Sequence, residues 1–102
     1  MRLMSSDEFC SLEVINLCGG VRLGFPCELE IDLECAKVIS LTVSPADKCF
    51  SLFGDKDEYV IPWCKIDCIG EDAILVKLPE SELSSCRRGK RRKKNRQNVN
   101  NL

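Results

Sequence analysis

Short runs of alternating apolar and polar residues, separated by glycine, proline and acidic turns, fill most of the first 78 residues. Alternation of period two is typical of β-strands with one buried face. No stretch has the sustained 3.6-residue periodicity of a long helix. The pattern predicts an all-β fold, a small barrel or sandwich of about six strands. The predicted strands are residues 12–18, 21–33, 38–44, 58–61, 66–69 and 73–78.

The second predicted strand is the longest and the most strongly patterned. Its apolar positions alternate with acidic ones, so we expect one buried face and one solvated face. Gly24 and Pro26 interrupt the strand and predict a bend or bulge that lets it curve. The apolar positions are Leu29, Ile31 and Leu33, and the acidic positions are Glu28, Glu30, Asp32 and Glu34.

Two signals set the limits of the folded unit. Ser5 and Glu8 have the spacing of a capping box, which predicts one helical turn at residues 6–10. After Pro79 the chain becomes polar and then basic, with too few apolar residues to offset the entropy of ordering. We therefore predict one domain at 1–79, followed by a polar linker and a disordered basic tail at 80–102.

Charge is divided unevenly along the chain. All 16 acidic residues lie within residues 1–86, together with seven of the 15 basic residues, and the other eight basic residues lie in 87–102. Such a run can bind phosphate backbones or anionic membrane surfaces without sequence specificity, or it can be a solvated tail attracted to the acidic body. No aromatic residue is interleaved to stack on bases. The basic residues are Arg87, Arg88, Lys90, Arg91, Arg92, Lys93, Lys94 and Arg96.

Eight cysteines are a high number for 102 residues. The N-terminal segment carries acidic residues where a secretory signal needs an apolar core, so we expect a cytoplasmic protein with reduced thiols. Reduced cysteine behaves as a small apolar residue, and we expect Cys27, Cys49, Cys64 and Cys68 to fill the core. Cys64 and Cys68 alone approach the spacing of zinc ligands, which leaves a metal site as the less favoured alternative. No cofactor is expected.

Catalytic chemistry is hard to assemble from this composition. The chain has no histidine, the residue used most often as a general base and proton shuttle. The carboxylates of residues 28–34 are about 6.6–7 Å apart along one strand face and do not converge. We therefore expect neither enzymatic activity nor a small-molecule substrate.

Several motifs together resemble those of the YlmC/YmxH family. They are MRL at the start, VINL before a glycine turn, RLG, ELEID, LFG, and YVIPW followed by IGEDAILV. Members of that family are small sporulation-associated proteins with a PRC-barrel domain, similar to domains of the photosynthetic reaction centre H subunit and of the ribosome-maturation protein RimM. The resemblance covers residues 1–78 and implies a compact β-barrel used for docking. The chain departs from the family in its many cysteines, its basic tail, and Cys35-Ala36 in a turn that commonly holds glycine.

These observations predict a non-enzymatic adaptor that binds an unidentified protein through an exposed sheet edge or an apolar loop. Self-association into a homo-oligomer is also expected to be possible, because edge strands accept further strands. If Trp63 is buried it belongs to the core, and if it is exposed it is a binding candidate. The alternative is a ribosome- or RNA-associated protein anchored by its tail. The docking candidates are Phe50, Leu52, Phe53 and Trp63.

Overall fold

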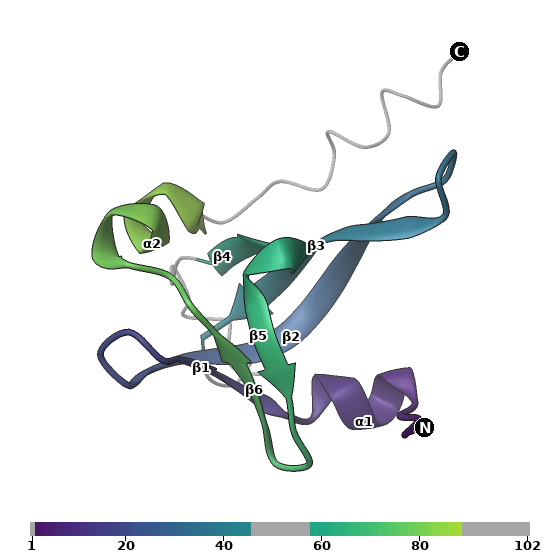
Figure 1. The fold of residues 1–102 in the computed structure, drawn as a ribbon, viewed down its shortest axis with the longest axis horizontal. Helices are drawn as coiled ribbons and strands as arrows, with labels where there is room; N and C mark the ends of the chain where they lie inside the picture. The colour runs from purple at the N-terminus through teal and green to yellow at the C-terminus, as the bar shows by residue number, and fades with distance from the viewer. Residues whose placement is uncertain (1, 46–57, 89–102) are drawn as a thin grey trace, which may run out of the picture.

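The computed structural model describes residues 2–45 and 58–88 (Figure 1). It confirms a mostly β fold, with all six predicted strands and the predicted helical turn at residues 6–10 present, and it adds a 3-10 helix, a second α-helix and a seventh strand. In chain order the elements are α1 (Ser6–Cys10), β1 (Glu13–Asn16), β2 (Val21–Asp32), β3 (Lys37–Ser44), β4 (Glu58–Pro62), the 3-10 helix η2 (Trp63–Lys65), β5 (Ile66–Ile69), β6 (Ala73–Val76), α2 (Glu80–Cys86) and β7 (Arg87–Arg88).

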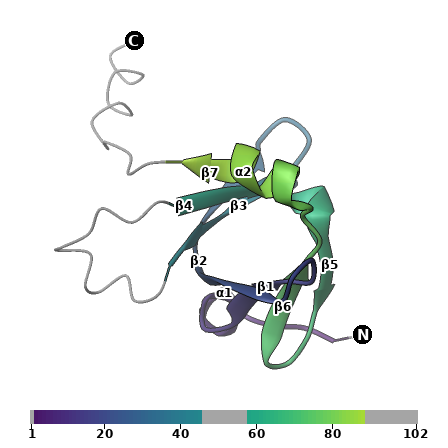
Figure 2. The same ribbon diagram turned by 90° about the vertical axis from the view of Figure 1, so that its left-hand side faces the viewer.

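The strands form one sheet in the order β5-β6-β1-β2-β3-β4-β7. Every neighbouring pair is antiparallel except β1 and β6, which run parallel. Figure 2 shows the sheet curling around its interior. Its two edge strands, β5 and β7, are not hydrogen-bonded to each other in the described part of the chain, so the ladder does not close into a barrel.

One hydrophobic core lies inside this curl. Strands β1, β3, β4 and β6 bury their inward residues almost completely, and the chain beyond β6 adds one more apolar side chain. Burying each such side chain stabilises the fold by about 1.5–3 kcal/mol relative to leaving it exposed. The core residues are Leu12, Val14, Leu23, Leu41, Val43, Ile61, Ile74, Val76 and Leu78.

Strand β2 bends at Gly24, as the sequence predicted. Its first part pairs with β1 and its remaining length pairs with β3, with register shifts on either side of the bend. Gly24 has φ of +129°, and a Cβ atom built there would collide with the carbonyl oxygen of Ser44. Only glycine fits both the backbone conformation and this close approach.

We expect Gly24→Ala to destabilise the protein by about 3 kcal/mol or more, because it adds left-handed strain to a backbone collision. Gly20→Ala is the matched control, since Gly20 also has positive φ (+64°) but open space around it within 4 Å. Strain alone should cost that variant about 1 kcal/mol. Urea denaturation measures both values, and equal losses would show that the collision is relieved by backbone movement.

A buried asparagine joins the end of β1 to the chain beyond β6. The Asn16 side chain donates to the Leu78 carbonyl (2.9 Å), and its Oδ1 accepts from the backbone N–H groups of Leu78 (3.0 Å) and Cys18 (3.1 Å). Its exposed fraction is 1%. These bonds satisfy backbone groups that would otherwise be buried without partners.

Replacing Asn16 with alanine should therefore lower the free energy of unfolding by about 2–4 kcal/mol, since several buried backbone groups lose their partners together. Ser11→Ala is the control: it removes an exposed side-chain bond to the Glu8 carbonyl (2.7 Å) and should cost under about 1 kcal/mol. Thermal and urea unfolding report the difference. A loss at Asn16 no larger than at Ser11 would contradict the structural role assigned to the amide.

The apolar face predicted for the second half of β2 is not buried. Leu29, Ile31 and Leu33 are 43%, 51% and 87% exposed, so that prediction was wrong. The β2–β3 hairpin from Glu28 to Thr42, hereafter the ribbon, pairs only with itself from Ile31 to Val38 and there extends beyond the rest of the sheet (Figure 1). The alternation correctly indicated a strand with two unlike faces, but no second layer among the described residues covers the apolar face.

Residues 80–88 differ from the prediction of a polar linker that leads into a disordered tail, while residues 89–102 lie outside the described ranges. Residues 80–86 form α2, and Leu83 and Cys86 on it pack against the core. Arg87 and Arg88 then form β7, which pairs with β4, and Arg88 makes an ion pair with Glu58 (3.1 Å). Two apolar residues three positions apart suffice for a seven-residue helix when a core is available, but they are too weak a periodic signal to predict one.

Candidate functional site

An apolar groove lies between the N-terminal segment, α1, β2 and the corner at η2. Its volume is about 420 Å³. We call it the Trp63 groove. It is lined by Arg2, Leu3, Met4, Ser5, Ser6, Phe9, Leu29, Trp63 and Ile69.

The capping box predicted from the sequence forms one wall of the groove. The Glu8 N–H donates to Ser5 Oγ (3.2 Å), and the Ser5 N–H donates to Glu8 Oε1 (2.9 Å). These two bonds fix the start of a helix only five residues long, which would not form on its own. The helix then holds Phe9 against Trp63, with ring centroids 6.1 Å apart and planes tilted by 41°. That tilted geometry is favourable for an aromatic pair.

Trp63 stands at the opposite wall, where Pro62 ends β4. The chain turns through η2, and the Ile66 N–H donates to the Trp63 carbonyl at the start of β5. Trp63 packs against the core yet is only half-buried. It therefore fits neither of the two predicted alternatives alone, because one part of the side chain supports the fold and another part faces the groove.

The lining sets the chemistry that the groove can accept. Six of its side chains are apolar or aromatic, two are serines, and Arg2 is the one ionisable residue among them. Sites of this kind bind apolar side chains, with a few polar groups fixing the orientation. Arg2 adds a preference for an acidic group at the rim.

Most of the other predicted site residues lie outside the described ranges. This holds for the loop candidates Phe50, Leu52 and Phe53, and for Lys90, Arg91, Arg92, Lys93, Lys94 and Arg96 of the tail. Arg87 and Arg88 are described, and both belong to β7. Of the four predicted docking residues, the structure therefore places Trp63 at an apolar groove.

The sequence reasoning did not find the partners of Trp63 in the groove. Leu3 is 86% exposed, and Phe9 and Ile69 are half-buried against the core. The capping box located Phe9 on a helix, but periodicity cannot show that five helical residues pack beside a corner 54 positions later. Leu29 was assigned to the core, so its value as a surface residue was missed.

Cys64 and Cys68 are both exposed, so the prediction that they fill the core was wrong. The 3-10 turn directs Cys64 outward, and a register shift between Ile66 and Cys68 disturbs the alternation of β5. Cys27 is half-buried, and Cys49 lies outside the described residues. Within residues 2–45 and 58–88, no three or more His, Cys, Asp or Glu side chains are grouped to hold a metal ion.

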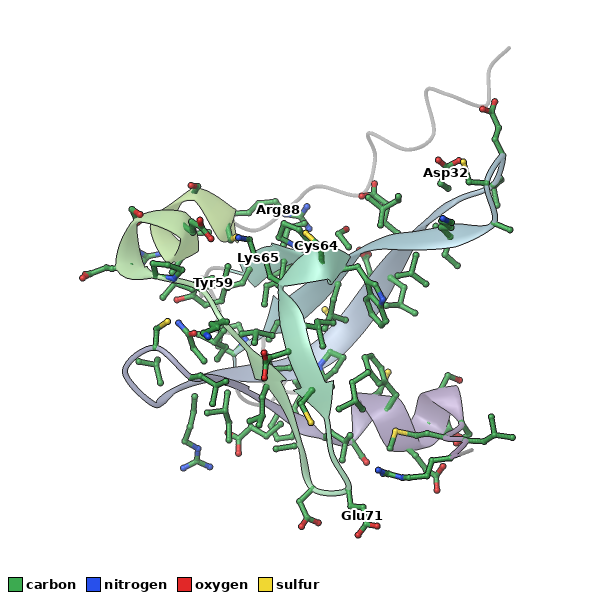
Figure 3. All side chains as sticks on the ribbon, viewed as in Figure 1. Asp32, Tyr59, Cys64, Lys65, Glu71 and Arg88 are labelled. Atoms are coloured by element: carbon green, nitrogen blue, oxygen red, sulfur yellow. The ribbon has the colours of Figure 1, made fainter. Side chains whose placement is uncertain are left out.

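The acidic face of the ribbon serves the hairpin itself. Glu30 accepts a hydrogen bond from Ser40 on the paired strand (3.1 Å). Asp32 accepts from the N–H groups of Glu34 (3.0 Å) and Cys35 (3.4 Å), an arrangement typical of acidic residues in turns. Asp32 lies near the far end of the ribbon in Figure 3. Ala36, in the same turn, has φ of +58°, a conformation that favours the glycine common in the family.

A second cluster joins α2 to the corner at η2. Lys65 makes an ion pair with Glu82 (2.8 Å), and Glu82 raises the pKa of the lysine. Burial, and then the charge of Glu82, raise the pKa of the Cys86 thiol. Cys86 is therefore a packed thiol, less suited to nucleophilic chemistry than an exposed one.

Cys86 should react with iodoacetamide more slowly than the exposed Cys35, because it is less accessible and its raised pKa lowers the thiolate fraction at a given pH. Glu82→Gln removes a charge that raises the pKa of Cys86 and should speed its alkylation. Lys65→Met removes a charge that lowers this pKa and should slow the reaction. Peptide mass mapping after timed labelling follows each site. Changes in the same direction in both variants would contradict this electrostatic account.

None of the helices in the described residues is long and apolar enough to cross a membrane. The chain matches no protein-family model. Over 78 residues it is 36% identical to the probable sporulation protein YlmC of Bacillus subtilis. The aligned residues make up 76% of this chain and 96% of that protein. The chain belongs to the YlmC family. It is also 41% identical over 66 residues to an uncharacterized protein of Clostridium acetobutylicum, covering 65% of this chain and 75% of the relative.

The two matches agree with the resemblance drawn from the motifs. The match to the B. subtilis protein spans 76% of this chain, and the motifs lie within its first 78 residues. In the structure, YVIPW supplies most of β4 and Trp63 at the start of η2, and IGEDAILV supplies Ile69 at the end of β5, the following turn and β6. Two residues of the motifs that carry the resemblance, Trp63 and Ile69, therefore also line the Trp63 groove.

Proposed function

We propose that this protein is a non-enzymatic adaptor with a role in sporulation, and that it docks a protein partner through the Trp63 groove. The sporulation role rests on kinship with the B. subtilis protein. The docking mechanism rests on one observation, the half-buried Trp63 in a groove lined mostly by apolar side chains. Aromatic anchors beside apolar pockets commonly supply most of the binding energy of protein interfaces.

The ionisable groups near the groove support binding rather than catalysis. Arg2 is the only charged side chain among the described residues that line the groove, so these residues offer no paired acid and base. The chain has no histidine to supply either role. An apolar surface with a single cation is better suited to holding a protein segment than to stabilising a reaction intermediate.

We interpret the curled seven-stranded sheet as a form of the PRC-barrel. This interpretation is supported by the family motifs and by the way the sheet turns around its core (Figure 2). The edge strand β5 ends at Ile69, which also lines the groove. A partner could therefore add a strand to β5 and place a side chain in the groove, a common mode of peptide recognition.

The alternative, an RNA- or ribosome-associated protein anchored by its tail, depends mainly on residues 89–102. No contact of the described residues favours it over docking. The deletion that tests it is best begun at residue 89, because Arg87 and Arg88 pair with β4 and removing them would disturb the sheet. If retention on nucleic acid at low salt is unchanged without residues 89–102, electrostatic anchoring by that segment fails.

Affinity purification of the tagged full chain from sporulating cells tests the adaptor. We expect one protein to be retained at high salt by the wild type and by Val21→Asp, and to be lost with Leu3→Asp. Leu3 and Val21 are both exposed aliphatic residues, 86% and 44%, but only Leu3 lines the groove. Equal retention by both variants would exclude the groove as the docking site.

Trp63 provides a direct readout, because it is the only tryptophan of the chain. Transfer of its exposed part from water into an apolar contact should shift its fluorescence emission to shorter wavelength when the isolated partner is added. No shift on formation of a stable complex would place the binding site elsewhere.

A further inference from the structure

The ribbon carries aliphatic side chains that the described residues leave partly exposed. Leu29 and Ile31 pair across it with Leu41 and Val38, so these side chains share one face, which is buried at Leu41 but 43% and 51% exposed at Leu29 and Ile31. Ile39 is the extra residue at the register shift between these two pairs and is 47% exposed. We call Leu29, Ile31 and Ile39 the ribbon face. Exposed aliphatic side chains gathered on one surface are a feature of interaction sites, so this face is a candidate for an occupant.

The ribbon face and the Trp63 groove form one continuous surface, because Leu29 belongs to both. One part of this surface projects and the other is hollow. Their chemistry also matches, since six of the nine residues that line the groove are apolar or aromatic and the ribbon face is formed by aliphatic side chains. Glu30 and Asp32 lie on the other face of the ribbon, where they accept hydrogen bonds from the hairpin itself. The chain thus carries both an apolar groove and a strand with an exposed aliphatic face.

We propose that the occupant is a second copy of this chain, and that the ribbon of each copy lies in the Trp63 groove of the other. The proposal rests on the docking role proposed above for the groove. A two-fold axis near Leu29 would bring the projecting part of each copy onto the hollow part of its partner. Such an interface is isologous and closes on itself, so it yields dimers rather than fibres.

The available surface is large enough for such a dimer. A standard interface buries about 800 Å² per partner, of which on the order of 500 Å² is apolar. The ribbon face, the exposed Leu3 and Leu33, and the groove supply apolar area of that order. Glu28, on the acidic face of the ribbon, would remain toward solvent, so the two acidic faces are not forced together.

Sedimentation velocity of the full chain over a dilution series tests the proposal. The monomer has a mass of 11.5 kDa, and we expect twice that mass at concentrations up to about 0.1 mM. Ile31→Lys should raise the dimer dissociation constant at least about tenfold by placing a charge in the apolar contact. Val21→Lys is the matched control, an exposed residue on the same strand but outside the ribbon face, and it should leave the dimer unchanged.

A mixing experiment separates ribbon-in-groove packing from ribbon-on-ribbon packing. Leu3→Glu alters the groove only, and alone it should also weaken the dimer. When Leu3→Glu and Ile31→Lys chains are mixed, one normal ribbon meets one normal groove, so a heterodimer should form more tightly than either homodimer. If the mixture is no tighter than the separate variants, the reciprocal arrangement is wrong.

The dimer and the adaptor function can fail separately. A wild-type chain that stays monomeric throughout the series overturns the dimer, while groove-dependent retention of another protein would still support the adaptor. If both variants weaken the dimer and no other protein is retained in the affinity purification, the dimer proposal is supported and the adaptor proposal loses its support.

Discussion

The close approach of β2 to Ser44 at Gly24 is the constraint on which most of this structure depends. Because the backbone passes there without a side chain, a single strand can pair with β1 on one side of the bend and with β3 on the other. That crossing joins the two halves of the curled sheet. It also directs the rest of β2 outward as the ribbon. Leu29 lies on that part of β2 and helps to line the groove, so the position of the groove depends on Gly24, which does not line it.

The sequence predicted the strands, the capped helical turn and the bend well, because each depends on residues close together in the chain. It failed where burial depends on what lies opposite. Leu29 and Ile31 have the alternation of a buried strand. Whether such side chains are buried depends on how far the neighbouring strands extend beside them, and alternation does not reveal this. For the same reason Trp63 was recognised as a candidate, while Phe9, from a segment 54 residues away, was not.

Three weak elements acquire their order from the core that they border. Helix α1 has five residues, η2 has three and β7 has two, and none would persist in isolation. A capping box fixes the start of α1, and the contact between Phe9 and Trp63 joins α1 to η2. The ion pair between Arg88 and Glu58 joins β7 to the sheet. Two of them, α1 and η2, supply residues to the groove that we propose for docking, and binding sites are commonly built from such small elements on a rigid support.

The amide of Asn16 has a further consequence for the lifetime of the molecule. Hydrolysis of this amide, which consumes water and releases ammonia, would leave a carboxylate that still accepts hydrogen bonds but cannot donate one to the Leu78 carbonyl. Two oxygen atoms would then face each other in a buried place, with a negative charge on one of them. A change of a single atom by slow chemical ageing would therefore act as a structural lesion. The packing that keeps water from the amide protects the protein against that event.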